Sequence, residues 1–127
     1  MATVLIVDDE MLIRWAVAES LSAAGFRVIQ AGSAAEALDH VGRRFADLAV
    51  AVLDLKLPDS HDFELLRRIR MLAPQCRVIL MTADLRPGIL TDAVAAGAFH
   101  ALAKPFDMHL MAGLVRVAAA APSADTR

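Results

Sequence analysis

Short, continuous apolar runs alternate along the chain with longer segments in which apolar residues recur at the spacing of one helix face. The runs are rich in β-branched residues and end at polar positions, as is typical of strands buried on both faces of a parallel sheet. The pattern predicts strands at residues 3–7, 27–30, 48–53, 77–82 and 100–103. It predicts helices at residues 11–24, 33–45, 62–72, 89–96 and 107–120. This strict alternation indicates an α/β domain with right-handed crossovers between parallel strands.

Local signals mark the ends of several predicted helices. Ser33 and Glu36 have the spacing of a capping box, which satisfies backbone N–H groups at the start of a helix. Gly25 and Gly97 follow two helical segments and suit the left-handed position beyond a helix end. Pro74 disfavours helical geometry in the residue before it, so the third helix should end ahead of it.

Carboxylates stand directly after two of the predicted strands. Asp8 and Asp9 follow the first strand, and Asp54 follows the third. Ligands of open α/β sheets bind at the carboxyl ends of the strands, where strand order reverses, so these acids should converge there. Close carboxylates raise the pKa of one of them unless a cation is present, and hard divalent cations prefer oxygen ligands. We therefore predict a Mg²⁺ site, rather than three acids that merely begin turns.

Two further polar residues lie at predicted strand ends. Thr82 closes the fourth strand and Lys104 follows the fifth, where a fixed turn at Pro105, such as a cis bond provides, would aim the lysine inward. A hydroxyl and an ammonium beside a Mg²⁺ site suit phosphoryl transfer, because the travelling group is stabilised mainly by positioning and charge. Asp54 would then be the nucleophile and form an aspartyl phosphate.

Composition limits the class of protein. The chain has 127 residues, of which 57% are hydrophobic and 22% charged, which suits one domain with a well-buried core. A formal net charge of −2 does not indicate the positively charged surface that binds nucleic acid, so direct DNA binding is not expected. No apolar run is long enough to span a bilayer, so we expect a soluble cytoplasmic protein without membrane contact. Cys76 is the only cysteine and is expected to be a structural thiol.

Between residues 3 and 118 the chain resembles the receiver domain of bacterial two-component response regulators. The resemblance is carried by the acid segment 7–10, the segment 54–59, Thr82-Ala83, and Gly97-Ala98 followed by Lys104-Pro105-Phe106. It implies a flavodoxin-like doubly wound α/β fold, a three-layer sandwich of five helices around a five-stranded parallel sheet of order 2-1-3-4-5. We assign residues 1–120 to this domain and residues 121–127 to a polar tail or linker stub.

The resemblance also implies how phosphate and metal are bound. Asp54 would accept a phosphoryl group from the phosphohistidine of a sensor histidine kinase or a histidine phosphotransfer protein. Asp9, Asp54 and the backbone carbonyl of Lys56 would bind Mg²⁺ directly, whereas Asp8 would act largely through water. Such a domain catalyses only its own phosphorylation and dephosphorylation, so it is not expected to be an enzyme on other substrates.

The phosphoryl oxygens would be held from the other side of the site. The resemblance assigns this role to the Thr82 hydroxyl, the Ala83 backbone N–H and Lys104, with Pro105 forming the turn behind the lysine. Thr82 would also be one half of a conformational switch. Its usual aromatic partner, three residues before the lysine, is replaced here by Ala101, and Phe99 fills that gap only in part.

A second departure concerns the loop after the phosphoacceptor. Family members usually have Asp-Gly where this chain has His61-Asp62, so the loop loses the conformational freedom of glycine. We expect Asp62 to cap the following helix instead. His61 could contact the phosphoryl group or the attacking water, but a surface position is the stronger expectation.

Two surfaces are candidates for partner binding. Leu12 and Trp15 lie off the apolar stripe of the first helix and should face water, where a kinase could dock. Leu110 and Val117 stand in the last helix at positions that are often charged in relatives. They indicate either a face for a second copy or an effector, formed by the last two helices and the fifth strand, or ordinary core packing.

Two other functions remain as alternatives. Ala101 and the altered loop would suit a degenerate receiver that only binds other proteins. A phosphatase or phosphotransferase with an aspartyl intermediate would need a second acid two residues after the nucleophile, where this chain has Lys56. The sequence does not name the kinase, the stimulus, the output or the oligomeric state, and an effector domain would be expected beyond Arg127 if the chain is a fragment.

Overall fold

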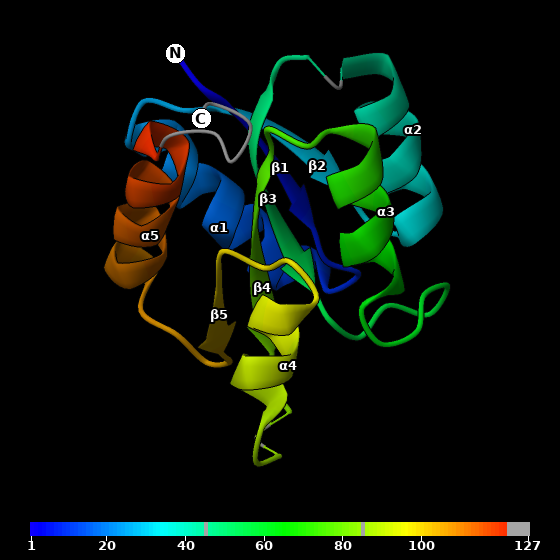
Figure 1. The fold of residues 1–127 in the computed structure, drawn as a ribbon. Coiled ribbons are helices and arrows are strands. Elements are labelled where there is room, and N and C mark those ends of the chain that lie inside the picture. The colour runs from blue at the N-terminus through cyan, green and yellow to red at the C-terminus, as the bar shows by residue number, and fades with distance from the viewer. Residues whose placement is uncertain (45, 85, 122–127) are drawn as a thin grey trace.

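The computed structural model describes residues 1–44, 46–84 and 86–121. Its strands are β1 (Thr3–Val7), β2 (Arg27–Ala31), β3 (Leu48–Asp54), β4 (Arg77–Thr82) and β5 (His100–Ala103). Its helices are α1 (Met11–Ala23), α2 (Ala34–Arg44), α3 (Glu64–Leu72), α4 (Ile89–Ala95) and α5 (Met108–Ala120) (Figure 1). The predicted alternation of strand and helix is thus confirmed within the described residues.

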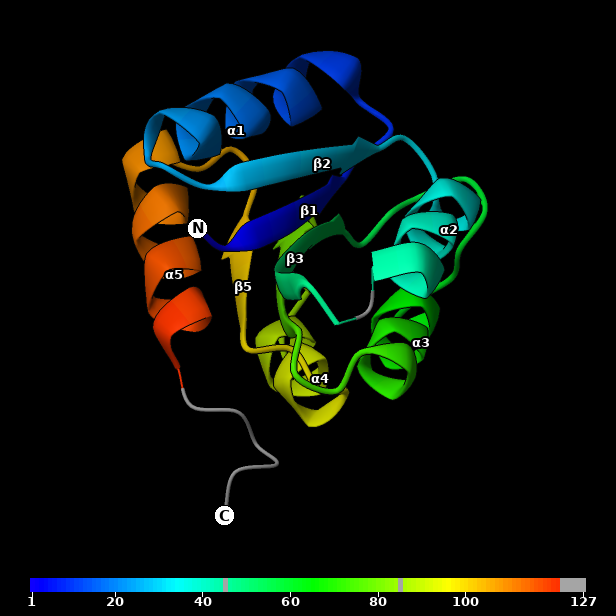
Figure 2. The ribbon, with the colours of Figure 1, turned by 90° about the horizontal axis from the view of Figure 1, so that it is seen from above.

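The strands form one parallel sheet in the order β2-β1-β3-β4-β5, as predicted. Helices α1 and α5 cover one face and α2, α3 and α4 cover the other, which gives three layers (Figure 2). Strand order reverses between β1 and β3, because the chain adds β2 on one side of β1 and the later strands on the other. The predicted doubly wound fold is therefore confirmed.

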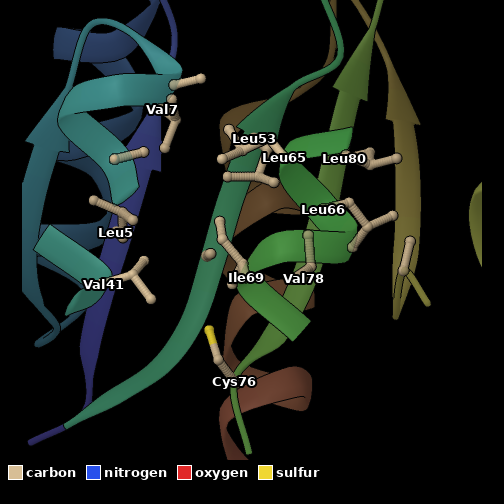
Figure 3. Close-up of a cluster of buried hydrophobic side chains, with 14 of the residues drawn as sticks. Leu5, Val7, Val41, Leu53, Leu65, Leu66, Ile69, Cys76, Val78 and Leu80 are labelled. Atoms are coloured by element: carbon tan, nitrogen blue, oxygen red, sulfur yellow. The ribbon is translucent and has the colours of Figure 1, made fainter. Parts of the chain in front are cut away.

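The core consists of one hydrophobic cluster on each face of the sheet. Along β1, Val4 and Ile6 face α1 and α5, whereas Leu5 and Val7 face α2 and α3, and all four are fully buried. This alternation explains why buried parallel strands appear in the sequence as continuous apolar runs. Figure 3 shows the cluster between the sheet and helices α2 and α3, in which Ile69 of α3 packs with side chains from the strands.

The start of α2 is tied to the loop that follows β3. The Glu36 N–H donates to Ser33 Oγ at 3.1 Å, as the predicted capping box requires, but the Glu36 carboxylate accepts from Gly32 N–H. The Asp59 carboxylate also accepts hydrogen bonds at 2.9 and 3.0 Å from the N–H groups of Ala34 and Ala35, respectively. These two hydrogen bonds lower the pKa of the Asp59 carboxyl. The loop after the candidate phosphoacceptor is therefore anchored on a neighbouring helix.

The predicted start of α3 was wrong. This helix begins at Glu64, its N-cap position is Phe63, and no side chain caps it. Asp62 lies one residue before the N-cap position, and its backbone is left-handed, with φ of 50°. The loop thus keeps a geometry that normally favours glycine, at a residue type that tolerates it.

Other boundaries differ from prediction by a few residues at most. β2 and β3 each extend one residue further, so that Asp54 is the last residue of β3. The predicted end of the second helix at Phe45 and the polar tail at residues 122–127 lie outside the described residues. Within the described part of the chain, no helix is long and apolar enough to cross a membrane.

Candidate functional site

The carboxyl ends of β1 and β3 bring two buried acids together. The two strands are neighbours in the sheet, and Val7 pairs with Leu53. Asp8 therefore follows β1 beside Asp54, the last residue of β3. The Asp8 side chain is fully buried and Asp54 is buried as well, so both carboxylates stand in a setting where charge is poorly solvated.

The structure adds a third carboxylate, that of Glu10. One oxygen from each of Asp8, Glu10 and Asp54 lies within 4.8 Å of the other two. Glu10 was given no role from the sequence, because nothing in the spacing of residues 7–10 shows that its side chain turns back over the strand ends. Asp9 is exposed and lies outside this group of three.

The Lys104 ammonium lies among the three carboxylates. Its Nζ is 2.9 Å from Asp8 Oδ2, 3.1 Å from Glu10 Oε1 and 3.1 Å from Asp54 Oδ2. The Lys104 N–H donates to the Thr82 carbonyl at 2.7 Å, and the following bond to Pro105 is cis. The Lys104 side chain thus points inward, into the group of acids.

Two groups in the site, Asp54 and Lys104, have raised pKa values. Burial raises the pKa of the Asp54 carboxyl, although hydrogen bonds from the Lys56 N–H and the Lys104 ammonium oppose this shift. Burial alone would lower the pKa of Lys104, but its hydrogen bonds to Asp8, Asp54 and Glu10 outweigh this effect and raise the pKa. Near neutral pH the lysine is therefore charged and supplies the positive charge that the carboxylates require.

The remaining predicted residues surround these groups. Thr82 is buried, and its hydroxyl accepts from the Asp84 N–H at 2.9 Å. Ala83 lines a cavity of about 390 Å³ together with Glu10, Lys104 and Phe106, so it adjoins the site. The Lys56 N–H donates to Asp54 Oδ1 at 3.0 Å, which places the Lys56 backbone beside the acid. His61 is exposed, as expected.

The donor set fits a hard divalent cation. Carboxylate oxygens from separate segments converge within 4.8 Å, and hard cations prefer such oxygen ligands. The ammonium among them shows that the site demands positive charge. The residues present can therefore hold Mg²⁺ near Asp54, consistent with the charge argument from the sequence.

The small side chain of Ala101 leaves space beside Thr82. A cavity of about 370 Å³ lies there, between β5 and the start of α4. Its walls include Thr82, Ile89, Leu90, Ala101 and Ala103. The departure at Ala101 is thus visible as an open volume next to Thr82, and Phe99 does not line it.

Both predicted apolar surfaces are exposed. Leu12 is 81% and Trp15 58% exposed on α1, as predicted. Leu110 is 53% and Val117 59% exposed on α5, so ordinary core packing of these two residues is excluded. Leu90 and Val94 of α4 are also more than half exposed.

Comparison with known proteins agrees with this geometry. The family model of the response regulator receiver domain matches residues 4–116. The chain is 35% identical over 105 residues to the sporulation initiation phosphotransferase F of Bacillus subtilis, with 83% of each chain covered. A response regulator protein from Burkholderia pseudomallei with a phosphorylated aspartic acid and a calcium ion is similar in structure, with a TM-score of 0.83 and 25% identity. That similarity covers 94% of this chain and 69% of the other.

A longer relative matches over its receiver part only. The chain is 34% identical over 121 residues to the DNA-binding transcriptional regulator NtrC of Rhizobium meliloti, which is 95% of this chain but 25% of that protein. The match therefore says nothing of the other three quarters of that regulator. Because the family match covers almost the whole sheet and the acids at its carboxyl edge, the chain belongs to the response regulator receiver domain family of two-component systems.

Proposed function

We propose that this chain accepts a phosphoryl group from a phosphohistidine onto Asp54, with Mg²⁺, and signals through the resulting change in conformation. The donor would be a sensor histidine kinase or a histidine phosphotransfer protein. The observation that supports this most strongly is the position of the buried Asp54 carboxylate, 3.1 Å from the Lys104 ammonium and beside the carboxylates of Asp8 and Glu10.

The reaction requires the carboxylate form of Asp54. An Asp54 oxygen forms the new bond to phosphorus while the bond from phosphorus to the donor imidazole nitrogen breaks, and the imidazole keeps the electron pair. Asp54 Oδ1 already accepts from the Lys56 N–H, which orients the carboxylate. Its other oxygen, Oδ2, faces Lys104.

The charge that develops on the phosphoryl oxygens has to be neutralised. Mg²⁺, when bound, would supply positive charge that offsets it. We assign the metal to Asp9, Asp54 and the Lys56 carbonyl, with Asp8 acting through water. Lys104, the Thr82 hydroxyl and the Ala83 N–H would hold the remaining phosphoryl oxygens, and Lys104 would exchange a carboxylate for a phosphoryl oxygen as the group arrives.

Two exposed surfaces suit the partners that this function needs. Leu12 and Trp15 are exposed near the start of α1, which follows the end of β1 and Asp8. This position suits docking of the phosphohistidine donor. The exposed apolar residues of α4 and α5 suit a second copy or an effector.

A second candidate function rests on Ala101. Without an aromatic beside Thr82, the chain could bind partners in a manner that does not depend on phosphate. The aspartyl phosphatase alternative has less support, because Lys56 occupies the position where a general acid would be needed and its side chain is exposed.

Labelling with a small phosphodonor tests the proposal. The wild-type chain and Asp54→Ala are incubated with acetyl phosphate, with and without Mg²⁺, and their intact masses are compared. The proposal expects one added phosphoryl group on the wild type only, and only with Mg²⁺. Equal labelling of the two proteins would reject Asp54 as the acceptor, and no labelling of either would reject the proposal in favour of the interaction module.

A further inference from the structure

The Arg14 guanidinium donates hydrogen bonds to a backbone carbonyl in the loop after β1 and to a side-chain amide, and not to a carboxylate. Arg14 belongs to α1 and is half-buried. Its Nη1 donates to the Asp8 carbonyl at 2.8 Å, and its Nε donates to Gln30 Oε1 on β2 at 3.2 Å. No ion pair among residues 1–44, 46–84 and 86–121 includes Arg14. The side chain therefore ties the loop after β1 to the end of β2 through uncharged acceptors.

These hydrogen bonds complete the set around Asp8. Its N–H donates to the Ala31 carbonyl at 3.1 Å, its Oδ1 accepts from the Glu10 N–H at 2.8 Å, and its Oδ2 accepts from Lys104 at 2.9 Å. The carbonyl oxygen is the remaining polar atom, and Arg14 holds it. Because a peptide unit is planar, holding the Asp8 oxygen also fixes the plane that leads into Asp9.

Gly32 makes room for this arrangement. A Cβ atom at Gly32 would lie 3.1 Å from Arg14 Nη1 and 3.9 Å from Cζ. The φ of Gly32 is not in the left-handed region, so the requirement at this position is space for the guanidinium rather than backbone freedom. Arg14 of α1 thus holds the Asp8 carbonyl, Gln30 of β2 holds the Arg14 Nε, and Gly32 in the loop before α2 leaves space for Nη1.

We infer that Arg14 is a positioning residue, which fixes the peptide between Asp8 and Asp9 and so holds the acids that follow β1 in place for the cation. This inference rests on the proposed function for its metal, but the positional role concerns this chain's own backbone. Groups that orient a metal ligand without touching the metal typically change affinity by 10- to 100-fold when removed. Arg14 acts through hydrogen bonds, so its position matters and not only its charge.

Four variants separate position from charge. Arg14→Met removes the guanidinium. Gln30→Met keeps the Arg14 charge and removes the oxygen that accepts from Arg14 Nε. Gly32→Ala keeps both hydrogen-bond acceptors of Arg14 but places a methyl group close to Nη1. The matched control is Arg27→Met, which removes the same charge from an exposed arginine at the start of β2, the other end of that strand. Thermal unfolding checks that each variant folds.

The first readout is Mg²⁺ alone, followed through the amide NMR signals of residues 8–10. We expect Arg14→Met to weaken Mg²⁺ binding by roughly tenfold or more, and Gln30→Met and Gly32→Ala to weaken it less, in the same direction. Arg27→Met should stay within about twofold of wild type, as surface substitutions usually do. With acetyl phosphate, the Mg²⁺ concentration for half-maximal labelling should rise in Arg14→Met, while labelling at saturating Mg²⁺ recovers.

The second readout needs neither metal nor phosphate. Without Mg²⁺, hydrogen exchange should be faster in Arg14→Met than in wild type and Arg27→Met at the amides of Asp8 and Glu10, which donate to the Ala31 carbonyl and to Asp8 Oδ1. Unchanged exchange, or equal weakening of Mg²⁺ binding in Arg14→Met and Arg27→Met, would overturn the inference. If Arg14→Met does not fold, unchanged Mg²⁺ binding in both Gln30→Met and Gly32→Ala overturns it. A wild-type chain that takes no label rejects the proposed function, whereas the exchange experiment still decides the role of Arg14.

Discussion

Lys104 and Asp54 are 50 positions apart in the sequence, yet Lys104 Nζ lies 3.1 Å from Asp54 Oδ2. The same ammonium contacts Asp8 and Glu10, so one cation is shared by three carboxylates. This sharing explains how two acids can be buried side by side at the end of a sheet. It also makes the protonation of Asp54 sensitive to each of its neighbours.

The pKa of Asp54 can be tested directly. Burial raises it above the ordinary value of 3.8, so in the folded state the contribution of this group to stability is greatest below that value and decreases as pH rises through the folded pKa. Lys104→Met should raise the pKa further, because a hydrogen bond and an attractive charge are lost. Asp8→Ala should lower it, because a repelling charge is lost. Carboxyl ¹³C titration without Mg²⁺ measures all three proteins, and shifts of the same sign in both variants would contradict this description of the charges.

The two acids after β1 should differ in their contribution to metal binding. We expect Asp9→Ala to weaken Mg²⁺ binding by about tenfold or more, and Asp8→Ala to weaken it less, because a direct ligand matters more than one acting through water. Calorimetric titration with Mg²⁺ gives both affinities, and Asp9→Asn is the matched control for the loss of side-chain volume. Equal losses for Asp8→Ala and Asp9→Ala would remove the distinction.

Much of this site was predictable, because it depends on where strands end. Continuous apolar runs gave the strands, and polar residues at their carboxyl ends, such as Asp8, Asp54 and Thr82, had to meet at one edge of a parallel sheet. Lys104 was likewise predicted from its place after the fifth strand and from the turn at Pro105, and the family resemblance implied the same role. The order of the strands and helices and the burial of the strands could therefore be predicted from the sequence.

Contacts between loops were not predictable in this way. Glu10 turns back to Lys104, and Arg14 reaches Gln30, 16 positions away, without any periodic signal in the sequence. No role was predicted for Asp59, although its carboxylate accepts hydrogen bonds from the start of α2. Asp62 was predicted to cap α3, but the N-cap position is Phe63 and the backbone of Asp62 is left-handed. Such contacts depend on how helices, strands and loops are positioned relative to one another in the folded protein. The local propensity of a residue carries no information about these positions.

Trp15 is predicted to serve docking rather than stability. It is 58% exposed, so Trp15→Ala should leave the thermal midpoint and acetyl phosphate labelling unchanged. Transfer from a phosphorylated kinase should slow by roughly tenfold or more, as expected for an aromatic anchor in an interface. Single-turnover transfer assays measure this rate, with Met71→Ala, an exposed apolar residue on α3, as control. Parallel loss of both labelling reactions, together with lower stability, would show that Trp15 is structural.

Ala101 should limit how far a phosphoryl signal spreads. Fewer contacts distinguish the two conformations when Thr82 has no aromatic partner, so the population shift should be small. Beryllofluoride should perturb the amide signals of the Asp54, Thr82 and Lys104 loops strongly and those of residues 99–117 weakly. Ala101→Tyr, which adds an aromatic ring at the cavity beside Thr82, should enlarge the response near Leu110.

The control for this change is His100→Tyr, which adds the same ring at an exposed neighbouring position on β5. Successive strand residues point to opposite faces, so this ring does not enter the cavity. Strong wild-type shifts throughout residues 99–117, or equal responses from the two tyrosine variants, would show that coupling does not need the missing aromatic.

The most direct test of the central claim is to locate the phosphoryl group after phosphotransfer. An acyl phosphate is reduced by borohydride to an alcohol, so a modified aspartate becomes homoserine, which peptide mass spectrometry can place in the sequence. Our account predicts homoserine at position 54 after Mg²⁺-dependent labelling, and none in Asp54→Ala. Homoserine at Asp8 or Asp9, or phosphate on a residue outside the site, would contradict it.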